Sequence, residues 1–386
     1  MSFVKKLKLD SLFDLRRILV VYILVTVTAS LHKYLIGTIN NYLIFKTSFF
    51  NLIAFNDLYT LFPQFHHDYY KYSPTFSLLM APMAVLPDYL GLIVWNLVNT
   101  LPLYYAIKKL DLEDRKKALI LWIVLVELVT SIQNCQSNGL YAAMFILTFV
   151  CLENKQSFWA ALIVVLAFFV KIFGLAAAIL FIFYPGRLRF LLYCVFWFVI
   201  LALAPLLVVP FKHLIFLYSS WYDLLTRDVI KLHGLSVMGI LKTWFGLKLS
   251  NPIAMLIGIV LLFLPLAKVR SYKDRYFRYL FLCSLLVWIV IFNHKAESPM
   301  FIIAVTGVAL WYVLQSFGKI YKFLLFLTLV ITSLSPTDIF PGYLRANFVQ
   351  PYLLKVVPCI LVWMVIEYQL LVGKNNKDQL VYKNIL

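Results

Sequence analysis

Charged residues are scarce in this sequence. They make up 13% of the 386 residues, whereas a typical soluble domain has about 25%. Hydrophobic residues make up 63%, and no soluble fold of this length buries that much apolar surface. The sequence also lacks the alternating segments of about 10 residues that a transmembrane β-barrel requires. We therefore expect an all-α polytopic membrane protein.

Two further features are missing. The five cysteines lie in or beside apolar segments without disulfide or metal-site spacing, which is typical of small buried hydrophobic residues. No stretch rich in glycine and serine divides the chain. The sequence thus predicts one integral membrane domain over residues 1–386, with an outer loop at 38–87 and a cytoplasmic tail at 373–386.

Apolar runs are abundant instead. They amount to about 12 crossings, each near the length that spans ~30 Å of hydrocarbon. Lysine and arginine gather in the N-terminal segment and in short loops between the runs, which the positive-inside rule assigns to the cytoplasm. The net charge of +18 is therefore a topology signal and predicts no nucleic-acid partner. We expect a multi-pass protein of the cytoplasmic (inner) membrane with both termini inside.

One outer face receives most of the unusual polar residues. With the runs laid out alternately, the segments that reach this face are 40–72, 133–138, Lys171, 212–248 and 294–297. The piece Ser73–Leu86 carries prolines and is too short to cross, which predicts a re-entrant or interfacial helix in the first outer loop. Lys171 interrupts the apolar run 157–184, and a broken helix is tolerated only where it lines a cavity.

The first outer loop holds the densest chemistry. Asp57 and Asp68 lie among histidines, a lysine and tyrosines, and each carboxylate is a candidate general base for a hydroxyl. A belt of interfacial aromatic residues with solvated charges is the alternative. His66, His67 and Asp68 also suggest a metal site, although adjacent histidines are not a recognised ligand spacing.

Cations recur at the other outer segments. Lys171, His294 and Lys295 are candidates for binding a phosphate, because cations stabilise the charge that develops on a phosphate leaving group. For Lys171 the alternative is a side chain that snorkels to the surface. Glu297 is a candidate for orienting His294 or pairing with Lys295.

Three other polar residues lie within or beside spans. Glu127 is in the middle of the span 118–134, where an acid is costly, so it pairs with a buried polar group or lines a cavity. Gln136 and Asn138 occupy a tight turn, either as substrate ligands or as caps of the helices around it.

Several of these stretches share a pattern with a known family. Asp57-Leu58-Tyr59 is followed by Tyr72-Ser73-Pro74, Leu86-Pro87 and Trp95-Asn96-Leu97; Gln136-Ser137-Asn138 forms a polar turn; and Val170–Gly174 places Lys171 at a helix break. In this order they resemble glycosyltransferase family 87, the polyprenyl-phosphate-mannose-dependent mannosyltransferases of the C-type glycosyltransferase fold. The similarity covers the N-terminal half well, and the C-terminal half mainly through residues 294–299.

One position departs from the family pattern. The family carries its proposed catalytic aspartate just beyond the first helix, where this chain has Asn40-Asn41-Tyr42. Asparagine cannot deprotonate a hydroxyl, so Asp57 or Asp68 takes over the role, or the activity is altered or absent. The substrate-binding residues that we expect beside these carboxylates are Asn41, Tyr42, Lys71, Tyr72, Gln136, Asn138 and Glu297.

The resemblance implies an inverting transfer of a hexose, with mannose as the expected sugar. The donor is a polyprenyl-phosphate sugar, the acceptor is a glycolipid or glycan hydroxyl on the outer face, and membrane lipids are the other partners. No cofactor is required, and a metal is not obligatory because cations neutralise the leaving phosphate. A secondary transporter is the main alternative, favoured by the number of spans, the broken helix and Glu127. A catalytically inactive lipid-binding relative is the third, favoured by Asn40-Asn41.

Overall fold

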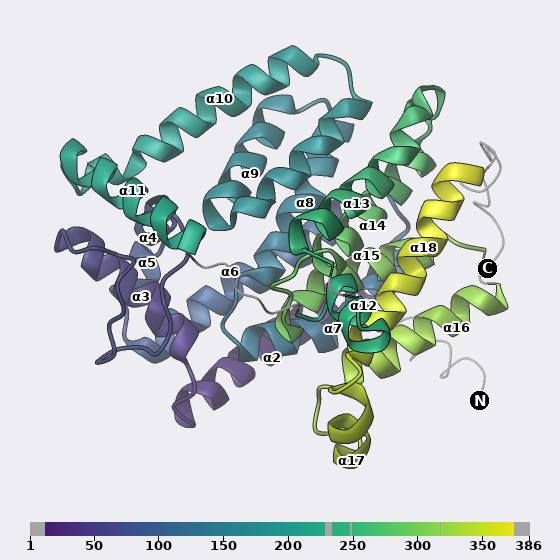
Figure 1. The fold of residues 1–386 in the computed structure, drawn as a ribbon, viewed down its shortest axis with the longest axis horizontal. Helices are drawn as coiled ribbons and strands as arrows, with labels where there is room; N and C mark the ends of the chain where they lie inside the picture. The colour runs from purple at the N-terminus through teal and green to yellow at the C-terminus, as the bar shows by residue number, and fades with distance from the viewer. Residues whose placement is uncertain (1–11, 228–233, 248, 317, 374–386) are drawn as a thin grey trace. The chain divides into compact units, whose positions relative to one another are not determined.

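The computed structural model describes residues 12–227, 234–247, 249–316 and 318–373. Every regular element among them is a helix, as the composition predicts (Figure 1). The first compact unit comprises Met1–Asp111 and Leu128–Lys231, and the second comprises Leu112–Glu127 and Leu232–Leu386. The single membrane domain expected from the sequence stays a prediction, and its cytoplasmic tail lies outside the described residues beyond Gly373.

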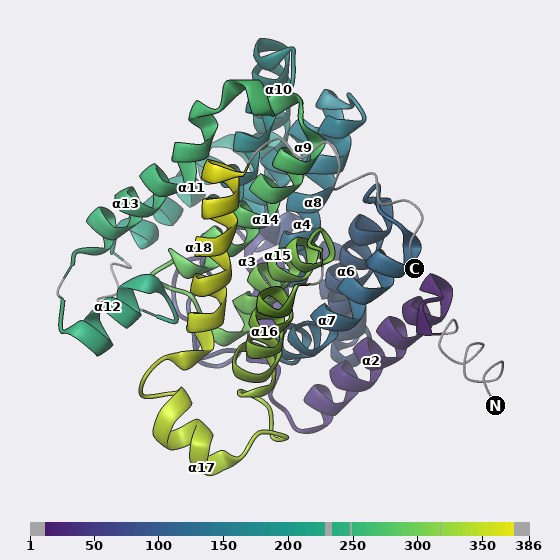
Figure 2. The same ribbon diagram turned by 90° about the vertical axis from the view of Figure 1, so that its right-hand side faces the viewer.

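The first unit is a row of packed helices with a looped outer part. Its long helices α2, α6, α8, α9 and α10 pack in that order, each against the next (Figures 1 and 2). The elements are α2 (Leu15–Leu35), α3 (Asn40–Ile53), α4 (Pro74–Leu79), α5 (Ala81–Ala84), α6 (Asp88–Lys109), α8 (Asn138–Glu153), α9 (Ser157–Val170), the 3₁₀ helix η1 (Ile172–Phe183), α10 (Arg187–Leu203), the 3₁₀ helix η2 (Ala204–Leu207) and α11 (Phe211–Arg227). Helix α7 (Asp114–Gln133) begins in the second unit and ends in the first.

The second unit is built around α14 and α15, which are buried along nearly their whole length and pack against α18. Its elements are α12 (Val237–Phe245), α13 (Asn251–Phe263), η3 (Leu264–Ala267), η4 (Val269–Lys273), α14 (Arg275–Ile291), η5 (Ser298–Met300), α15 (Phe301–Val313), α16 (Lys319–Leu327), the π-helix η6 (Thr328–Leu334), α17 (Gly342–Leu344), the π-helix η7 (Arg345–Val349), η8 (Leu354–Val356) and α18 (Val357–Val372).

Short polar residues fix where the helices begin. Asp14 accepts a hydrogen bond from Arg16 N at the start of α2, and Asp274 does the same for Tyr276 N at the start of α14. Such caps satisfy backbone N–H groups that have no partner inside the helix. The apolar runs expected at 118–134 and 157–184 correspond to α7 and to α9 with η1, to within a few residues.

The membrane assignment rests on length and composition. In the described ranges, four helical segments are long and apolar enough to cross a bilayer: Leu15–Leu35, Asp88–Lys109, Arg187–Leu207 and Leu354–Val372. Five further apolar helices are shorter, with 10–17 residues each. The protein is thus a helical membrane protein, and the total of about 12 crossings stays a prediction.

The first outer loop contains more helix than expected. The predicted short helix Ser73–Leu86 forms as α4 and α5, which are too short to cross a membrane. Helix α3 was not expected, because its polar residues made the segment look like loop. The break predicted at Lys171 is present: Lys171 has an extended backbone, and η1 folds back against α9 with Gly174 packed tightly on Ala167.

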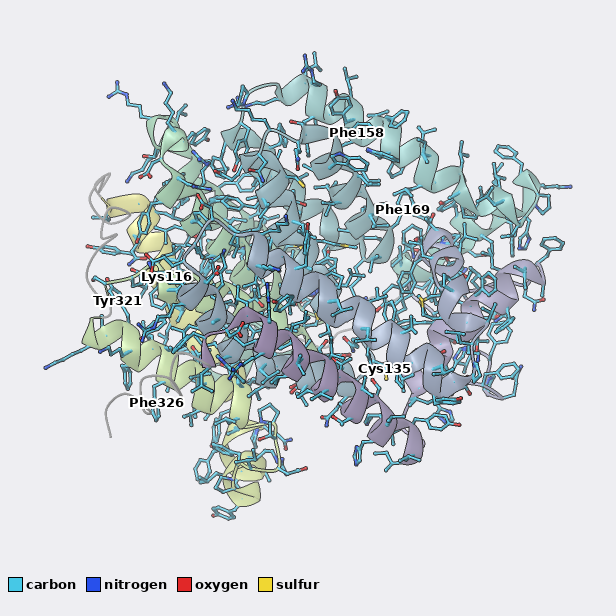
Figure 3. The ribbon with its side chains drawn as sticks, turned by 180° about the vertical axis from the view of Figure 1, so that it is seen from behind. Lys116, Cys135, Phe158, Phe169, Tyr321 and Phe326 are labelled. Atoms are coloured by element: carbon cyan, nitrogen blue, oxygen red, sulfur yellow. The ribbon has the colours of Figure 1, made fainter. Side chains whose placement is uncertain are left out.

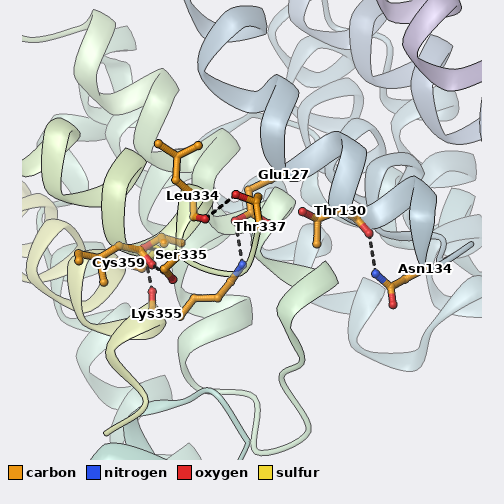
Figure 4. A network of polar contacts seen from close by, with 10 residues as sticks. Glu127, Thr130, Asn134, Leu334, Ser335, Thr337, Lys355 and Cys359 are labelled. Carbon is orange, nitrogen blue, oxygen red and sulfur yellow. Dashed lines mark hydrogen bonds and ion pairs between the residues drawn. The ribbon is translucent and has the colours of Figure 1, made fainter. Parts of the chain in front are cut away.

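The second unit buries an ion pair. Lys355 Nζ donates to Glu127 Oε1 at 2.9 Å, and both side chains are almost fully shielded from solvent (Figure 4). Thr332 Oγ1 donates to the backbone oxygen of Lys355 at 2.8 Å, which fixes the segment that carries the lysine. A charge in an apolar interior is stable only when it is paired and hydrogen-bonded. Of the two roles expected for Glu127, the geometry therefore fits pairing with a buried group.

We expect Glu127→Gln to destabilise the protein by about 3–5 kcal/mol, because it leaves the Lys355 ammonium buried and unpaired. The double variant Glu127→Leu/Lys355→Met should recover most of this loss, since it removes both charges. Equilibrium unfolding in mixed micelles measures the difference. Asp114→Asn is the control, because Asp114 pairs with Lys117 on the same helix at the surface and should cost under about 1 kcal/mol. A Glu127→Gln effect no larger than that of the control would contradict a stabilising pair.

Candidate functional site

The helix break and the polar turn meet in the first unit. Lys171 Nζ donates a hydrogen bond to Asn138 Oδ1 at 2.7 Å, and Asn138 Nδ2 donates to Gln136 Oε1 at 2.8 Å. Asn138 is fully buried at the start of α8, whereas Lys171 and Gln136 are partly exposed. The three residues form one chain of hydrogen bonds that holds an ammonium group at the edge of the protein.

The first outer loop is fastened to the same break. Ser73 Oγ donates to Phe169 O at 2.5 Å and accepts from Phe76 N, so one hydroxyl caps α4 and satisfies a carbonyl at the end of α9. Tyr141 OH donates to Lys171 O at 3.3 Å. Broken helices in an apolar setting need such donors for their unpaired carbonyls. Figure 3 labels Phe169 at this end of α9, and Phe158 at the other.

Aromatic side chains fill the space beside the ammonium group. Lys171 Nζ lies 5.9 Å from the ring centroid of Tyr72, within the range of a cation–π contact. Tyr72 stacks on Phe76 at 4.6 Å and meets the edge of Phe45 at 4.9 Å, and Phe45 in turn contacts Trp95. Three stretches that the sequence analysis singled out are therefore neighbours: 72–76, 136–138 and Lys171.

The asparagines at the start of α3 hold the loop in place. Asn40 Oδ1 accepts a hydrogen bond from the backbone N–H of His67 at 3.0 Å, and Asn41 Nδ2 donates to Asn134 O at 2.8 Å. Tyr42 OH donates to Met83 O at 3.1 Å and is buried against α6. All three side chains thus make structural contacts, and Asn40 lies directly beside the backbone that leads into Asp68.

The two candidate carboxylates differ in their surroundings. Asp68 is exposed, one residue beyond the N–H that Asn40 accepts. Asp57 is half-buried: its Oδ1 accepts from Tyr59 N at 3.1 Å, which closes a turn, and Ser220 Oγ lies 3.5 Å from its Oδ2. The turn matches the local hydrogen-bonding role that Asp often takes. Asp68 is therefore the more exposed of the two carboxylates.

Helix α11 braces the loop from the other side. Trp221 Nε1 donates to Lys71 O at 3.1 Å, and Tyr218 OH lies 3.2 Å from Thr75 Oγ1. The Lys71 side chain itself is exposed. Ser73 was expected only as part of the motif Tyr72-Ser73-Pro74, and α11 only as part of the outer segment 212–248, without a role for any single side chain. The helical spacing of Leu214, Leu217 and Trp221 could have predicted α11 as an amphipathic helix, because these are the side chains that α11 buries.

Burial sets the protonation of three loop residues. It raises the pKa of Tyr59 and of Tyr70 well above 10, so both hydroxyls keep their protons. Tyr59 OH donates to Tyr72 O and Tyr70 OH donates to Ser73 O, which ties the loop to itself. Burial also lowers the pKa of His66 below 6.5, which favours its neutral form.

The remaining candidates lie in the second unit. Lys295 N donates to Asn293 Oδ1 at 2.9 Å, and Ala296 O accepts from Leu235 N at 2.9 Å. Gly234 packs against the backbone of this loop so tightly that a side chain there would collide with it. His294 and Lys295 are partly exposed and Glu297 is exposed. Leu235 of the segment 212–248 and Ala296 of the segment 294–297, both expected on the outer face, are thus in contact within this unit.

A metal site formed by several side chains was weighed for His66, His67 and Asp68. Within the described ranges, no group of three or more histidine, cysteine, aspartate or glutamate side chains is arranged to hold a metal ion. The polar groups near Lys171 are the amides of Asn138 and Gln136 and the phenol of Tyr72.

The comparisons with known proteins identify one family. The sequence model of glycosyltransferase family 87 matches residues 70–292, which is more than half of the chain. The match spans Tyr72, the polar turn 136–138 and Lys171, the parts that the fold brings together. No curated protein matches the chain.

We expect the loop 54–73 to loosen as the pH falls below 6.5. A histidine whose pKa is lowered by folding contributes stability above its unfolded pKa and loses it as the pH drops through its folded pKa. Hydrogen exchange of this segment at about pH 7.5 and about pH 5.5, corrected for intrinsic rates, measures the change. His66→Gln should flatten the pH dependence, while His67→Gln, at an exposed side chain, should preserve it. Loss of the dependence in the His67 variant alone would refute the assignment.

Proposed function

Because the chain belongs to glycosyltransferase family 87, we propose that it transfers a hexose from a polyprenyl-phosphate donor to an acceptor hydroxyl on the outer face of the cytoplasmic membrane. The family makes the protein a membrane glycosyltransferase that uses a sugar donor and an acceptor. Mannose is the proposed sugar, and a glycolipid or glycan is the proposed acceptor. The observation that supports this reading best is the hydrogen bond from Lys171 to Asn138, which joins two family-like motifs at a helix break.

Lys171 is the proposed ligand of the donor phosphate. Asn138 holds its ammonium group at the edge of the aromatic cluster around Tyr72, where the low dielectric strengthens an interaction with an anion. As the bond between the anomeric carbon and the phosphate oxygen breaks, negative charge grows on the phosphate. A fixed cation stabilises that charge, and this is how the site would lower the barrier.

Asp68 is the proposed general base. The family position is Asn40 here, and Asn40 accepts the N–H of His67, so the next carboxylate along the loop lies beside that position. Asp68 is exposed and can meet an acceptor hydroxyl, whereas Asp57 is engaged in its own turn. In the proposed reaction Asp68 takes the hydroxyl proton while the oxygen attacks the anomeric carbon from the face opposite the phosphate, which inverts its configuration.

The residues of the second unit complete the proposal. His294 and Lys295 are proposed as further ligands of the donor phosphate, and Glu297 as a substrate ligand. Their loop is held by the backbone hydrogen bond between Leu235 and Ala296. Asn41, Tyr42, Lys71, Tyr72 and Gln136 are proposed to shape the substrate site of the first unit.

Two residues favour the rival functions, and each of them makes a defined contact. Glu127, which most favours a transporter, is paired with Lys355 in a buried position. Asn40, which most favours an inactive relative, has a structural role in holding the loop. The direct test uses the purified protein in liposomes with radiolabelled polyprenyl-phosphate mannose and membrane glycolipids. Transfer of label supports the proposal; donor binding without transfer supports the inactive relative; and sugar uptake into the liposomes supports the transporter.

We expect Lys171→Ala to lower donor use by roughly 10- to 150-fold, because a hydrogen bond to a charged group contributes about 1.5–3 kcal/mol. Lys171→Arg should retain more activity, since it keeps the cation. Rates at limiting donor measure the effect. The matched control is Lys155→Ala, an exposed lysine at the opposite end of α9, which should be neutral. Full turnover of Lys171→Ala at limiting donor would mean that Lys171 only snorkels to the surface.

We expect Asp68→Asn to lower turnover by about 10²–10⁴-fold while donor binding stays intact, as for loss of a general base. Asp57→Asn should cost less, because Asp57 mainly closes a local turn. Single-turnover rates and donor binding, measured on the same preparations, separate chemistry from affinity. Equal and small effects of both substitutions would exclude the loop carboxylates and leave Glu297 as the base.

A further inference from the structure

Helix α11 has two faces with different tasks. One face buries Leu214, Leu217 and Trp221 against the first unit and carries the contacts to the outer loop. The opposite face exposes large apolar side chains, namely Phe211, Ile215, Phe216 and Tyr222. A helix with this pattern in a membrane protein is suited to lie in the plane of the bilayer surface. Figure 1 shows α11 at the edge of the first unit, close to α4.

A groove lies where α11 meets the end of α3. It is lined by Phe55, Pro210, Lys212, His213 and Phe216 and has a volume of about 360 Å³. The His213 ring lies 5.7 Å from that of Phe55 and 5.6 Å from that of Phe216. His213 Nε2 is buried and has no hydrogen-bond partner among the residues that the structure describes. The lining is thus mainly apolar, with Lys212 and His213 as its polar side chains and no carboxylate among its residues.

We propose that this groove binds the headgroup of an anionic bilayer phospholipid. Lys212 Nζ and an N–H of His213 donate to the phosphate, and the start of an acyl chain packs on Phe55 and Phe216. The aromatic walls offer apolar contacts that a free phosphate cannot use, and the Lys212 ammonium group complements a net negative headgroup. A position at the bilayer surface supplies this ligand at high local concentration.

Such a lipid would act on the outer loop through α11. The buried face of the helix holds the loop by Trp221 at Lys71 O, by Tyr218 at Thr75 and by Ser220 at Asp57. A headgroup bound on the other face restrains the same helix and therefore the loop that it braces. The lipid site is distinct from the donor-phosphate site proposed at Lys171. Lipid bound at this site would make the conformational stability of the outer loop depend on the anionic lipid content of the membrane.

The test uses the full chain in nanodiscs that contain photoactivatable phosphatidylglycerol or, in a parallel set, photoactivatable phosphatidylcholine. Crosslinked peptides are mapped by mass spectrometry, and hydrogen exchange of residues 54–73 is followed in both membranes. The variant Lys212→Gln/His213→Gln removes the basic pair. Arg227→Gln is the matched control, because Arg227 is an exposed cation at the other end of α11. Phe216→Ser tests the apolar wall separately.

We expect phosphatidylglycerol to label the peptide that contains residues 210–216. Because one basic side chain near a membrane surface corresponds to about five-fold in binding, the double variant should lower labelling by at least that factor. Arg227→Gln should leave it unchanged, and Phe216→Ser should lower it without altering the melting temperature. Protection of residues 54–73 should be higher in phosphatidylglycerol than in phosphatidylcholine.

Three results would overturn the proposal. Equal labelling by the two lipids would mean general contact with the bilayer. If the double variant were labelled as strongly as the unmodified protein, Lys212 and His213 would not bind the lipid. Displacement of the probe by polyprenyl phosphate at low mole fraction would assign the groove to the carrier lipid instead. Each readout is independent of sugar transfer, so failure here is separable from failure of the proposed function.

Discussion

The site depends on how a helix ends within an apolar layer. When α9 stops at Val170, its last carbonyl groups lose their helical partners, and hydrocarbon offers no replacement. Ser73 supplies a hydroxyl to Phe169 O, and Tyr141 supplies one to Lys171 O. Phe169 O therefore receives a donor from a distant loop, whereas Lys171 O accepts from Gly174 N of the following 3₁₀ helix as well as from Tyr141. The same contacts place the loop next to Lys171, so the requirement for backbone satisfaction also assembles the candidate site.

Buried hydroxyl and amide groups replace charge throughout this region. The hydroxyl groups of Tyr59 and Tyr70 bond carbonyls of the loop, and Asn41 bonds the carbonyl of Asn134. These neutral donors cost less to bury than ions, because no charge is removed from water. Lys171 is a cation within the same arrangement, and Asn138 orients it with a neutral oxygen in place of a carboxylate. The Asn138 oxygen orients the ammonium group by a hydrogen bond, which suits the role proposed for Lys171 as a ligand of an anionic donor.

Much of the architecture was predictable because it follows from local pattern. Apolar length predicted α2, α6 to α10, α13 to α16 and α18, and the proline-rich stretch and the lysine within an apolar run marked α4, α5 and the break before η1. Helix α3 was missed because its polar residues resemble a loop until their partners are known, such as Met83 O for Tyr42. The partner of Glu127 was missed for a related reason, since Lys355 is 228 residues away in sequence and sits in an unremarkable segment. Residue types in a sequence indicate which side chains can take part in chemistry. Which distant residues contact each other depends on the packing of the helices, and a single sequence does not reveal that packing.

The contact between Ser73 and Phe169 also has a consequence for biosynthesis. The two residues are separated by 96 positions, so the loop leaves the ribosome well before the helix end to which it binds. At about 5–20 residues per second, the delay is roughly 5–20 s. During that interval the tyrosines and prolines of the loop have left the ribosome without their final support. The nascent chain therefore has a period in which a protective partner, such as an insertion chaperone, would have the greatest effect on yield.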